Sequence, residues 1–525
     1  MADIDNKMEK IVSLAKRRGF VFQGSEIYGG LAGTYDFGPF GVTLKNNIVR
    51  EWWKTFVENR EDMYGLDASI LMNEKVWEAS GHTGAGFSDP MVSCMECGSR
   101  FRVDHLIGNS DNYFSFGKQI LSRLLEINAE DLNKSEDLSS LLDYKGKQLS
   151  KGENEYWKTE MSKLKENRNH IKRAIEEMES FEKFSGWFAK HYLGVFVTCP
   201  KCAKQNWGDI EDFNLMFETK VGAEGTVKSY LRPETAQGIF VNFKNVVDTM
   251  SPKLPFGIAQ VGKAFRNEIA PRDFLFRVRE FEQMEIEYFI REEEWKEQFE
   301  TWREEIWKWF DHLGLKRENV RELEVPENDL AHYSKRTVDF EFNFPGKGFD
   351  ELAGFAYRTN HDLKSHMEAS GTSLEYIEAD GNRFIPHVLE PSFGLGRTIV
   401  AVLAEAYTED DLGGDTRVFL KLPAHLAPYR VAVSPLLKNK PELVEKAREV
   451  FLMLKKEFGN VAWDDNGNIG KRYRRQDEIG TPACIVIDFD TLGENPTLLD
   501  TVTVRDRDTG EQKRVAISEL INTLK

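Results

Sequence analysis

The sequence predicts a multidomain α+β protein that ends in a smaller α/β module. At 525 residues the chain is longer than one ordinary domain. Apolar runs bounded by glycine and proline predict strands at residues 256–261, 281–290 and 338–344, and a helix rich in Trp and Glu is expected near 292–313. After residue 428, strand-like and helix-like segments alternate to the end of the sequence, which is typical of an α/β module. We expect its strands at 431–433, 461–463, 483–489 and 501–505, and its helices at 441–458 and 517–524.

The composition is that of a globular protein. Hydrophobic residues make up 41% of the chain and charged residues 30%, and the mean hydropathy is −0.49. No apolar run reaches the roughly 20 residues that a membrane span needs, which excludes a transmembrane protein. The first residues lack the pattern of a secretory signal, and five cysteines are too few for a disulfide scaffold. We therefore expect a cytoplasmic protein without a membrane partner.

The formal net charge of −17 excludes a protein that coats nucleic acid non-specifically. Residues 423–525 contain 16 Lys and Arg against 16 Asp and Glu, so the whole negative excess lies in the first 422 residues. A neutral module beside an acidic body is compatible with an anionic partner that binds mainly at the C-terminal end. The same distribution is also compatible with no such partner.

Changes of composition divide the chain into four segments. We interpret 1–110 and 193–422 as two parts of one body, 111–192 as an insertion between them, and 423–525 as the C-terminal module. Within the insertion, apolar residues recur at steps of three and four, which predicts a helical hairpin or a small bundle. The insertion is either a packed appendage without chemistry or a surface that contacts a large ligand. An amphipathic helix rich in Trp and Phe is expected at 44–59.

Four of the five cysteines form two Cys-x-x-Cys pairs, Cys94 with Cys97 and Cys199 with Cys202. Each pair offers two thiolates to a tetrahedral zinc ion, and one ion bound by both pairs would join the base of the insertion. The 101 residues between the pairs exceed the usual spacing. Reduced cysteines, a site that has lost its metal, and a redox pair therefore remain alternatives to a structural zinc. Cys484 lies in an apolar run and is expected in the core.

A stretch of arginines and carboxylates runs from Phe265 to Glu285. Its pattern predicts two strands joined by a loop, with Arg277, Arg279 and Phe281 pointing the same way from the second strand. Guanidinium groups bind phosphate oxygens in a bidentate manner and an aromatic ring stacks a base, so this face suits a nucleotide. A solvated pair of charged strands is the alternative interpretation.

A glycine-containing motif precedes an apolar run at 398–403 and consists of Glu390-Pro391-Ser392-Phe393-Gly394-Leu395-Gly396-Arg397. Glycines at the start of a helix let backbone amides and an arginine approach an anion. The motif is neither a P-loop nor a dinucleotide fingerprint, because it lacks both Gly-Lys-Ser/Thr and the third glycine. Taken alone, it is a weak indication of a phosphate site.

These motifs resemble those of the class II aminoacyl-tRNA synthetases. Phe265-Arg266-Asn267-Glu268 with Arg277 and Phe281 resembles motif 2, and Gly394-Leu395-Gly396-Arg397 resembles motif 3. Gly38-Pro39-Phe40-Gly41 with the helix behind it resembles motif 1, which carries the dimer interface. Five further sequence segments are similar to those of the glycyl-tRNA synthetases of the homodimeric type. They are Trp77-Glu78-Ala79-Ser80-Gly81-His82, Phe101-Arg102-Val103-Asp104-His105, Leu231-Arg232-Pro233-Glu234-Thr235-Ala236-Gln237-Gly238, Ile469-Gly470-Lys471-Arg472-Tyr473 and Asp477-Glu478-Ile479-Gly480-Thr481-Pro482. The resemblance spans nearly the whole chain and is weakest around 111–192.

The resemblance implies a fold, partners and a reaction. The fold is a catalytic antiparallel sheet flanked by helices, with a helical insertion and a C-terminal α/β anticodon-binding domain, in a homodimer. Glycine attacks the α-phosphate of ATP, which enters with Mg²⁺, to give glycyl-adenylate and pyrophosphate, and tRNA(Gly) then accepts the glycyl group on its terminal adenosine. Neither step needs a nucleophile from the enzyme, so catalysis consists of positioning and charge stabilisation.

The resemblance also implies a role for each nucleotide-site residue. Arg266 would hold the α-phosphate and the glycine carboxylate, Glu268 would accept from the adenine amino group, and Phe281 would stack the adenine. Arg397 would stack on the other face of the base or reach the γ-phosphate, and Arg266 and Arg397 are the implied catalytic residues. The complete nucleotide set is Arg266, Asn267, Glu268, Phe276, Arg277, Val278, Arg279, Glu280, Phe281, Glu351, Leu352, Gly394, Leu395, Gly396 and Arg397, with Glu351 acting through magnesium.

The implied glycine site consists mainly of carboxylates that would hold the substrate ammonium group. Its residues are Arg102, Glu234, Phe281, Glu282, Gln283, Met284, Glu285, Glu390, Pro391, Ser392, Phe393 and Gly394. Ion pairs that only hold strands together are the alternative for any one of them. The densest basic cluster of the C-terminal module, beside Tyr473, would contact the anticodon of tRNA(Gly) and consists of Lys471, Arg472, Arg474 and Arg475.

Two other functions fit the same fold. A non-catalytic accessory subunit with a synthetase-like fold would have lost the motif residues, whereas Arg266, Arg397, Glu234 and Glu390 are all present here. A synthetase for another amino acid is the second alternative. Pyrophosphate exchange with each amino acid separates these possibilities.

Overall fold

The computed structural model describes residues 2–84, 87–103, 106, 197–204, 206–223, 227–269, 271, 273–327, 330–412 and 414–525. The chain forms two compact units. The first contains Met1–Ser80, Met216–Val325 and Leu330–Lys525, and the second contains Gly81–Leu215 and Pro326–Asp329. The expected helical insertion at 111–192 lies outside the described residues.

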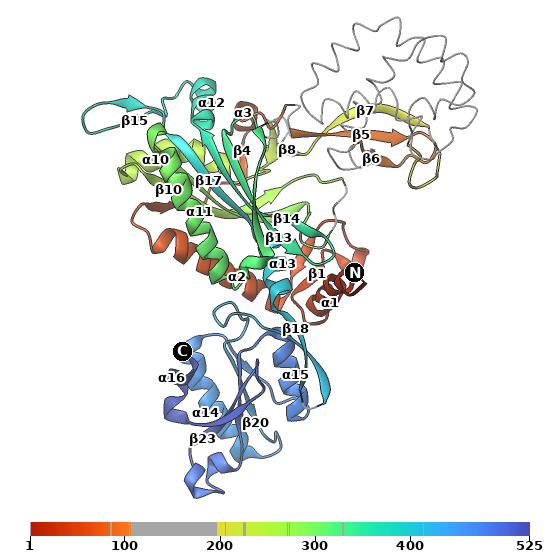
Figure 1. The fold of residues 1–525 in the computed structure, drawn as a ribbon, viewed down its shortest axis with the longest axis vertical. Coiled ribbons are helices and arrows are strands. Elements are labelled where there is room, and N and C mark those ends of the chain that lie inside the picture. The colour runs from red at the N-terminus through yellow and green to blue at the C-terminus, as the bar shows by residue number, and fades with distance from the viewer. Residues whose placement is uncertain are drawn as a thin grey trace, which may run out of the picture. The chain divides into compact units, whose positions relative to one another are not determined.

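A seven-stranded sheet forms the centre of the first unit (Figure 1). All neighbouring strands are antiparallel except β3, which pairs in parallel with β10. This arrangement, with helices on both faces, confirms the predicted α+β class. In spatial order the strands are β12 (Val320–Glu324), β13 (Arg336–Phe344), β14 (Gly348–Thr359), β17 (His387–Gly394), β11 (Glu280–Ile290), β10 (Phe256–Phe265) and β3 (Met63–Gly65).

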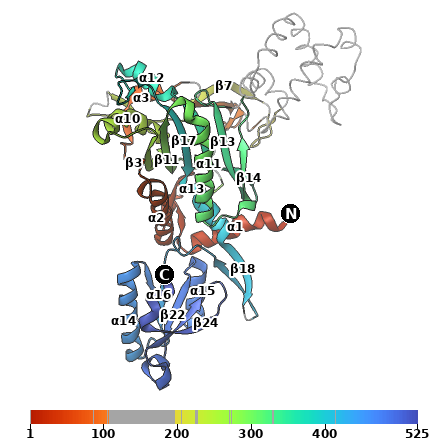
Figure 2. The ribbon, with the colours of Figure 1, turned by 60° about the vertical axis from the view of Figure 1, so that its left-hand side comes forward.

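Alternation along the strands gives the sheet an apolar face and a second, partly polar face. On the apolar face, Met284, Ile286 and Tyr288 of β11 join one large core cluster with residues of α2 (Pro39–Trp53), α11 (Trp295–His312) and α13 (Leu395–Ala406). On the other face, α10 (Ala236–Met250) and α12 (His361–Ser370) share a smaller cluster with β10 and β17. Figure 2 shows α11 and α13 lying beside the central strands.

The predicted strands 256–261, 281–290 and 338–344 all lie within observed strands, and the helix expected near 292–313 is α11. The helix expected at 44–59 begins earlier, at Pro39, because the fixed φ of proline suits the first turn of a helix. Its last turn, Lys54–Glu58, widens into a π-helix. Arg277 and Arg279 were expected on the second strand of the arginine-rich motif. This was wrong, because β11 begins at Glu280 and both arginines lie in the preceding loop.

Shorter elements complete the body of the first unit. Helix α1 packs against α13, and α3 packs against α12. These elements are α1 (Ala2–Arg17), α3 (Glu74–Ala79), the hairpins β1 (Val21–Gln23) with β2 (Tyr35–Phe37), β15 (Tyr376–Ile377) with β16 (Arg383–Phe384) and β18 (Tyr407–Leu412) with β19 (Asp415–Leu420), and the sheet of β4 (Leu71–Asn73), β9 (Val227–Leu231) and β8 (Phe217–Val221).

The C-terminal module has a mixed five-stranded sheet with its own core. Its order is β21 (Val461–Trp463), β20 (Val431–Pro435), β22 (Ala483–Ile487), β23 (Thr501–Asp506) and β24 (Gln512–Ala516), and its helices are α14 (Pro441–Phe458), α15 (Ile469–Ile479) and α16 (Leu520–Leu524). The predicted strands and helices of the module are all present. The sequence did not predict β24, an edge strand with two exposed charged or polar residues at its start.

The second unit contains a three-stranded antiparallel sheet of β6 (Arg100–Arg102), β5 (Ser88–Cys94) and β7 (Trp207–Asn214). A small apolar cluster around Val92 and Val103 packs with Trp207 of β7. Among the described residues of the whole chain, no helix is long and apolar enough to cross a membrane.

Candidate active site

The polar face of β11 carries the central residues of the candidate site. Phe281, Gln283, Glu285 and Glu287 alternate along the strand with residues that face the core. β10 lies on one side of β11 and β17, with Glu390 and Ser392, on the other. The antiparallel register pairs Glu285 directly with Ser392.

Arg266 follows β10 and reaches towards this face. Its backbone nitrogen donates to the carbonyl oxygen of Arg279 at 3.0 Å, and its Nε donates to the carbonyl oxygen of Pro233 at 3.1 Å. The guanidinium carbon lies 5.5 Å from the ring centroid of Phe281. Arg266 and Phe281, to which the resemblance assigns the α-phosphate and the adenine, thus lie against each other.

The loop between β10 and β11 is held by its own arginines. Arg277 Nε donates to Glu268 Oε2 at 2.8 Å, and Arg279 Nε donates to the carbonyl oxygen of Glu268 at 2.9 Å. Arg279 Nη1 also donates to the carbonyl oxygen of Ala32 at 2.7 Å. Glu268 is buried, and Arg277 fixes its carboxylate while Arg279 fixes its backbone carbonyl.

Arg397, in the first turn of α13, lies over Phe276 and not over Phe281. Its guanidinium carbon is 4.4 Å from the Phe276 centroid, and Lys347 Nζ is 3.3 Å from the same centroid. Arg397 Nη1 also forms an ion pair of 2.8 Å with Glu351 Oε2. Gly396 lets the helix start lie close to the loop, since a Cβ there would be 2.9 Å from the carbonyl oxygen of Leu275.

Glu351 on β14 and Asp339 on β13 lie near Arg397, while Glu341 of β13 pairs with Arg321 at 2.6 Å. Glu341 is paired with Glu351 across the two strands, and Asp339 lies two residues before Glu341. Burial, with Glu351 and Glu341 adding to it, raises the pKa of Asp339 to about 7. Hard divalent cations bind carboxylate oxygens, so these side chains have the chemistry to hold a magnesium ion next to a triphosphate.

Glu285 is the most extensively bonded carboxyl group of the polar face. Its Oε1 accepts from Ser392 Oγ at 2.8 Å and from Gln283 Nε2 at 3.4 Å, and its Oε2 accepts from Thr235 Oγ1. Its side chain is buried, and burial, with Glu234 adding to it, raises its pKa. Two hydroxyl donors therefore fix the orientation of a buried carboxyl group.

Sequence reasoning missed Arg358, which ties the pocket together. This fully buried side chain donates to both oxygens of Asp362 at 2.8 and 2.7 Å, and to Glu390 Oε1 at 2.8 Å. Its guanidinium carbon lies 3.8 Å from the ring centroid of Tyr333. The sequence feature that could have revealed it is an arginine at the end of the apolar run of β14. A buried charge there needs a partner, because an unpaired one would be too costly.

Among these carboxyl groups the pKa values of Glu285 and Glu390 are raised, whereas that of Asp362, paired with Arg358, is lowered. Burial raises the pKa of Glu390 to about 8; Arg358 opposes the shift, and Glu285 and Glu234 add to it. Glu234 accepts from Gln237 Nε2 at 3.0 Å, and the same amide donates to Asp362 at 3.1 Å. A cluster of several neighbouring buried carboxyl groups is suited to a cationic ligand such as an ammonium group.

Several predicted site residues place their side chains elsewhere. The side chains of Leu352 and Leu395, predicted for the nucleotide, and of Met284 and Phe393, predicted for glycine, all lie in the large core cluster. Glu282 forms an ion pair of 2.8 Å with Lys45. Arg102 belongs to the second unit, where it forms an ion pair of 2.7 Å with Asp89.

The four expected cysteines come together in the second unit. Cys94 Sγ lies 3.6 Å from Cys202 Sγ, Cys97 Sγ lies 3.7 Å from Cys199 Sγ, and all four sulfur atoms lie within 4.8 Å of one another. All are free thiols. Sulfurs about 2.3 Å from a tetrahedral zinc are roughly 3.8 Å apart, so the cluster fits zinc.

Two similar turns present these sulfurs. The amide of Gly98 donates to the carbonyl oxygen of Cys94 at 2.8 Å, and the amide of Ala203 donates to that of Cys199 at 2.8 Å. Hydrogen bonds from Ser99 lower the pKa of Cys97 to about 6. Burial and the neighbouring thiols raise the pKa of Cys202 to about 12, so the geometry of the two turns, and not the ionisation of one thiol, indicates metal binding.

The basic cluster of the C-terminal module divides into buried and exposed members. Arg472 is buried and donates to the carbonyl oxygens of Pro435, Asp465 and Gly467 at 2.5, 3.1 and 2.9 Å. It therefore supports the fold and is not available to an RNA. Arg475 forms an ion pair of 2.7 Å with Asp464, and Arg474 donates to the carbonyl oxygen of Thr416, whereas Lys471 is exposed.

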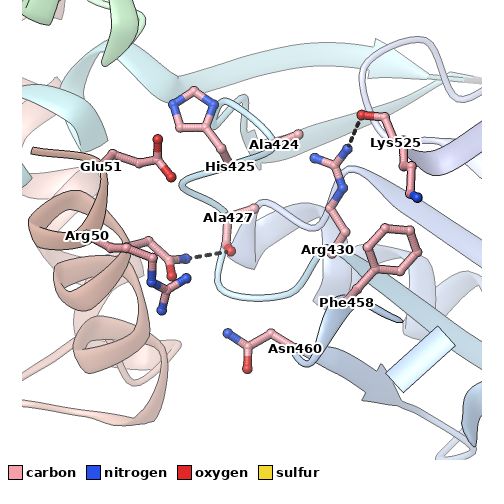
Figure 3. A pocket seen from close by; sticks show the side chains of 10 residues that line it. Arg50, Glu51, Ala424, His425, Ala427, Arg430, Phe458, Asn460 and Lys525 are labelled. Atoms are coloured by element: carbon pink, nitrogen blue, oxygen red, sulfur yellow. Dashed lines mark hydrogen bonds between the residues drawn. The ribbon is translucent and has the colours of Figure 1, made fainter. Parts of the chain in front are cut away.

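Two cavities in the first unit are distinct from the carboxyl pocket. One of about 70 Å³, too small for a nucleotide, is lined by Val278, Phe281 and Gly396 among others. The other, of about 570 Å³, lies between α2, the segment from Ala424 to Ala427 and the C-terminal module (Figure 3). Arg430 donates there to the carbonyl oxygen of Lys525 at 2.9 Å. No predicted site residue lines this second cavity, so it is not the candidate site.

Two family models and several curated relatives match the chain. The tRNA synthetase class II core domain (G, H, P, S and T) matches residues 217–406, and an anticodon binding domain matches 430–525. The glycine–tRNA ligase of Clostridium tetani is 45% identical over 99% of this chain and 98% of its own length. The glycine–tRNA ligase of Caldanaerobacter subterraneus is 46% identical over 98% of this chain and 96% of its own length, and that of Deinococcus radiodurans is 45% identical over 98% and 97%.

Proposed function

Because the chain belongs to the glycine–tRNA ligase family, we propose that it activates glycine with ATP and transfers the glycyl group to the 3′ end of tRNA(Gly). The observation that carries this proposal is the buried pair of carboxyl groups of Glu285 and Glu390 on the same face of the sheet as Phe281, against which Arg266 lies. The pocket suits an ammonium group and the arginine suits a phosphate. The ammonium group belongs to glycine and the phosphate to ATP, which are the two substrates of adenylate formation.

The chain's own residues supply positioning and charge in the first step. Arg266 neutralises the α-phosphate as the glycine carboxylate attacks it, while Phe281 stacks the base and Glu268 accepts from the adenine amino group. Arg397 contributes positive charge near the outer phosphates, and Glu351 with its neighbour Asp339 would hold the magnesium ion that accompanies ATP. The ammonium group of glycine binds Glu234, Glu285 and Glu390, with Ser392 and Arg358 orienting these carboxylates.

The remaining assignments belong to the same proposal. The four-cysteine cluster binds one structural zinc ion. The C-terminal module contacts the anticodon of tRNA(Gly), and two copies of the chain pair through the segment that contains Gly38–Gly41 and α2. The enzyme works in the cytoplasm, and its catalytic, inserted and anticodon-binding parts follow the boundaries predicted from composition.

Pyrophosphate exchange into ATP, measured separately with each amino acid, tests the proposed function. We expect exchange with glycine, and Arg266→Ala should slow it by roughly 100-fold or more, the scale of losing one main charge stabiliser. Arg303→Ala is the control. Arg303 lies in α11, on the face of the sheet opposite to the candidate site, and pairs with Glu322. Near-normal exchange in Arg266→Ala would contradict the role of Arg266, and exchange with another amino acid alone would contradict the function.

A further inference from the structure

Glu287 is a carboxyl group that has no role in the mechanism above. It follows Glu285 by two residues in β11, so both side chains lie on the polar face of the sheet. Glu287 is fully buried, and neither of its oxygens has a hydrogen-bond partner in the described part of the chain. Because burying an unpartnered polar group is costly, its presence inside the pocket wall indicates a role.

The charged groups that face Glu287 come from its own strand and from three other elements. β11 contributes Glu285, β17 contributes Glu390, β14 contributes Arg358 and α12 contributes Asp362. On β10 the residue paired with Glu287 is an isoleucine, so that strand contributes no charge there. The surroundings therefore contain three further buried carboxyl groups and one guanidinium group.

The guanidinium group of Arg358 hydrogen-bonds to two other carboxyl groups. Three of its five N–H donors go to Asp362 and Glu390, and none of the five bonds to Glu287 in the described part of the chain. Arg232, which also lies near the cluster, donates to two backbone carbonyl oxygens. Four neighbouring buried carboxyl groups cannot all be ionised, because burial and like charges both favour the protonated form. Burial, with Glu390 adding to it, holds the pKa of Glu287 well above its usual range.

A protonated Glu287 is well placed to donate to Glu390. The register that pairs Glu285 with Ser392 brings Glu287 opposite Glu390 on the neighbouring strand. Side chains at such positions start about 5 Å apart at Cβ, within reach of a hydrogen bond between two carboxyl groups. Arg358 donates to Oε1 of Glu390, so Oε2 can accept the hydrogen bond from Glu287.

We propose that Glu287 is a positioning residue of the glycine site, which keeps its proton and donates that O–H to Glu390 when Glu390 binds the substrate ammonium group. This inference rests on the proposed function. A neutral acid at this position orients Glu390 without adding a negative charge that would repel it. An ionised Glu287 would do the opposite, because it would raise the cost of ionising Glu390.

Glycine and ATP KM values in pyrophosphate exchange separate a positioning role from a purely structural one. Glu287→Leu removes the donor and should raise the glycine KM by roughly tenfold or more, the scale of losing a hydrogen bond to a charged group, with the ATP KM nearly unchanged. Glu287→Gln replaces the O–H donor with an N–H donor and should restore the glycine KM to within about threefold of the wild type. Its pH profile for the glycine KM should match that of the wild type, because the proposed acid does not titrate.

Tyr288→Phe is the matched control, since Tyr288 is the next residue but faces the core and donates to Asp62. It should leave the glycine KM unchanged. A Glu287→Gln enzyme as impaired as Glu287→Leu, or an unaltered glycine KM in Glu287→Leu, would overturn the inference. Absence of any glycine-dependent exchange in the wild type would instead overturn the proposed function.

Infrared difference spectroscopy of the wild type against Glu287→Gln keeps the inference testable even where Glu287→Leu does not fold. A neutral carboxylic acid has a C=O band distinct from that of a carboxylate. We expect a neutral band that is lost in Glu287→Gln and persists in the wild type with glycine bound. A carboxylate band at this position in the glycine complex would contradict the inference.

Discussion

At the scale of single residues, the carboxyl groups of the candidate glycine site outnumber the guanidinium groups that bond to them. Arg358 is the guanidinium that hydrogen-bonds to its carboxyl groups, and it does so through Asp362 and Glu390. Glu285 relies instead on the hydroxyl groups of Ser392 and Thr235. Neutral donors can orient a carboxyl group without cancelling its charge, so the site remains ready for an ammonium group from the substrate.

Glycine binding should therefore depend on pH. Glu390, with its pKa at about 8 in the free enzyme, is mostly protonated below that pH and must lose its proton to bind an ammonium group. The glycine KM should fall as pH rises from 6.5 to 8, by roughly tenfold, and then level off, because each pH unit below the pKa reduces the ionised fraction about tenfold. Exchange kinetics at saturating ATP measure this, with the ATP KM as the internal control. A glycine KM that is flat or rises over this range would contradict the assignment.

Ser392 should also determine selectivity. Every competing amino acid is larger than glycine, so a tight wall rejects it by overlap. Ser392→Gly removes the Cβ and Oγ beside Glu285 and should raise the ratio of alanine to glycine exchange by roughly tenfold, the lower end of the effect of one methylene-sized change. Ser392→Ala is the control, because it loses the hydrogen bond but retains the Cβ wall. An unchanged ratio in Ser392→Gly would remove Ser392 from the wall.

At the scale of elements, strands with strict alternation were the most predictable. β11 carries core residues at Met284 and Ile286 and polar residues between them, a pattern of period two that predicts a half-buried strand. The same pattern predicts that Glu285 shares a face with Phe281 and Gln283, whereas its role in a glycine site is implied by the family resemblance. The pattern could not show that Arg358, on a strand distant in sequence, completes the pocket, because that contact depends on the order of strands in the sheet. Nor could it show that Arg277 and Arg279 lie in a loop stabilised by Glu268.

The two Cys-x-x-Cys turns lie side by side, and the spacing of their four sulfur atoms fits a zinc ion. We expect about one zinc ion per chain in protein purified without a chelator, measured by atomic absorption. Cys199→Ser should lose the metal and lower the melting temperature. Cys484→Ser is the control, since Cys484 lies in β22 of the C-terminal module and should leave the zinc content unchanged. Full zinc content in Cys199→Ser would exclude the cluster as the site.

At the scale of the whole molecule, buried ion pairs join the C-terminal module to the rest of the first unit. Arg417 of β19 is buried, pairs with Asp410 at 2.6 Å and with Asp477 of α15 at 3.4 Å, and donates to the carbonyl oxygen of Arg507. Asp477 also pairs with Arg505 at 2.8 Å. Such a network is costly to break, because the loss of one partner leaves a buried charge unpaired. The module is thus fixed through α15, the helix that also carries the basic cluster.

The basic cluster of α15 contains both buried and exposed residues, so tRNA recognition is best tested at an exposed one. Arg472 supports the fold through three carbonyl oxygens, so its removal would damage the module itself. Lys471 is exposed on the same helix and can lose its charge without breaking a bond in the described structure.

Lys471→Gln should lower kcat/KM for charging tRNA(Gly) by roughly fivefold and reduce the salt dependence of tRNA binding by about one ion, the effect of one phosphate contact, while pyrophosphate exchange stays normal. Lys513→Gln, at an exposed position on β24, is the matched control. Equal losses of charging and exchange in Lys471→Gln would show that this helix face serves folding and not the RNA.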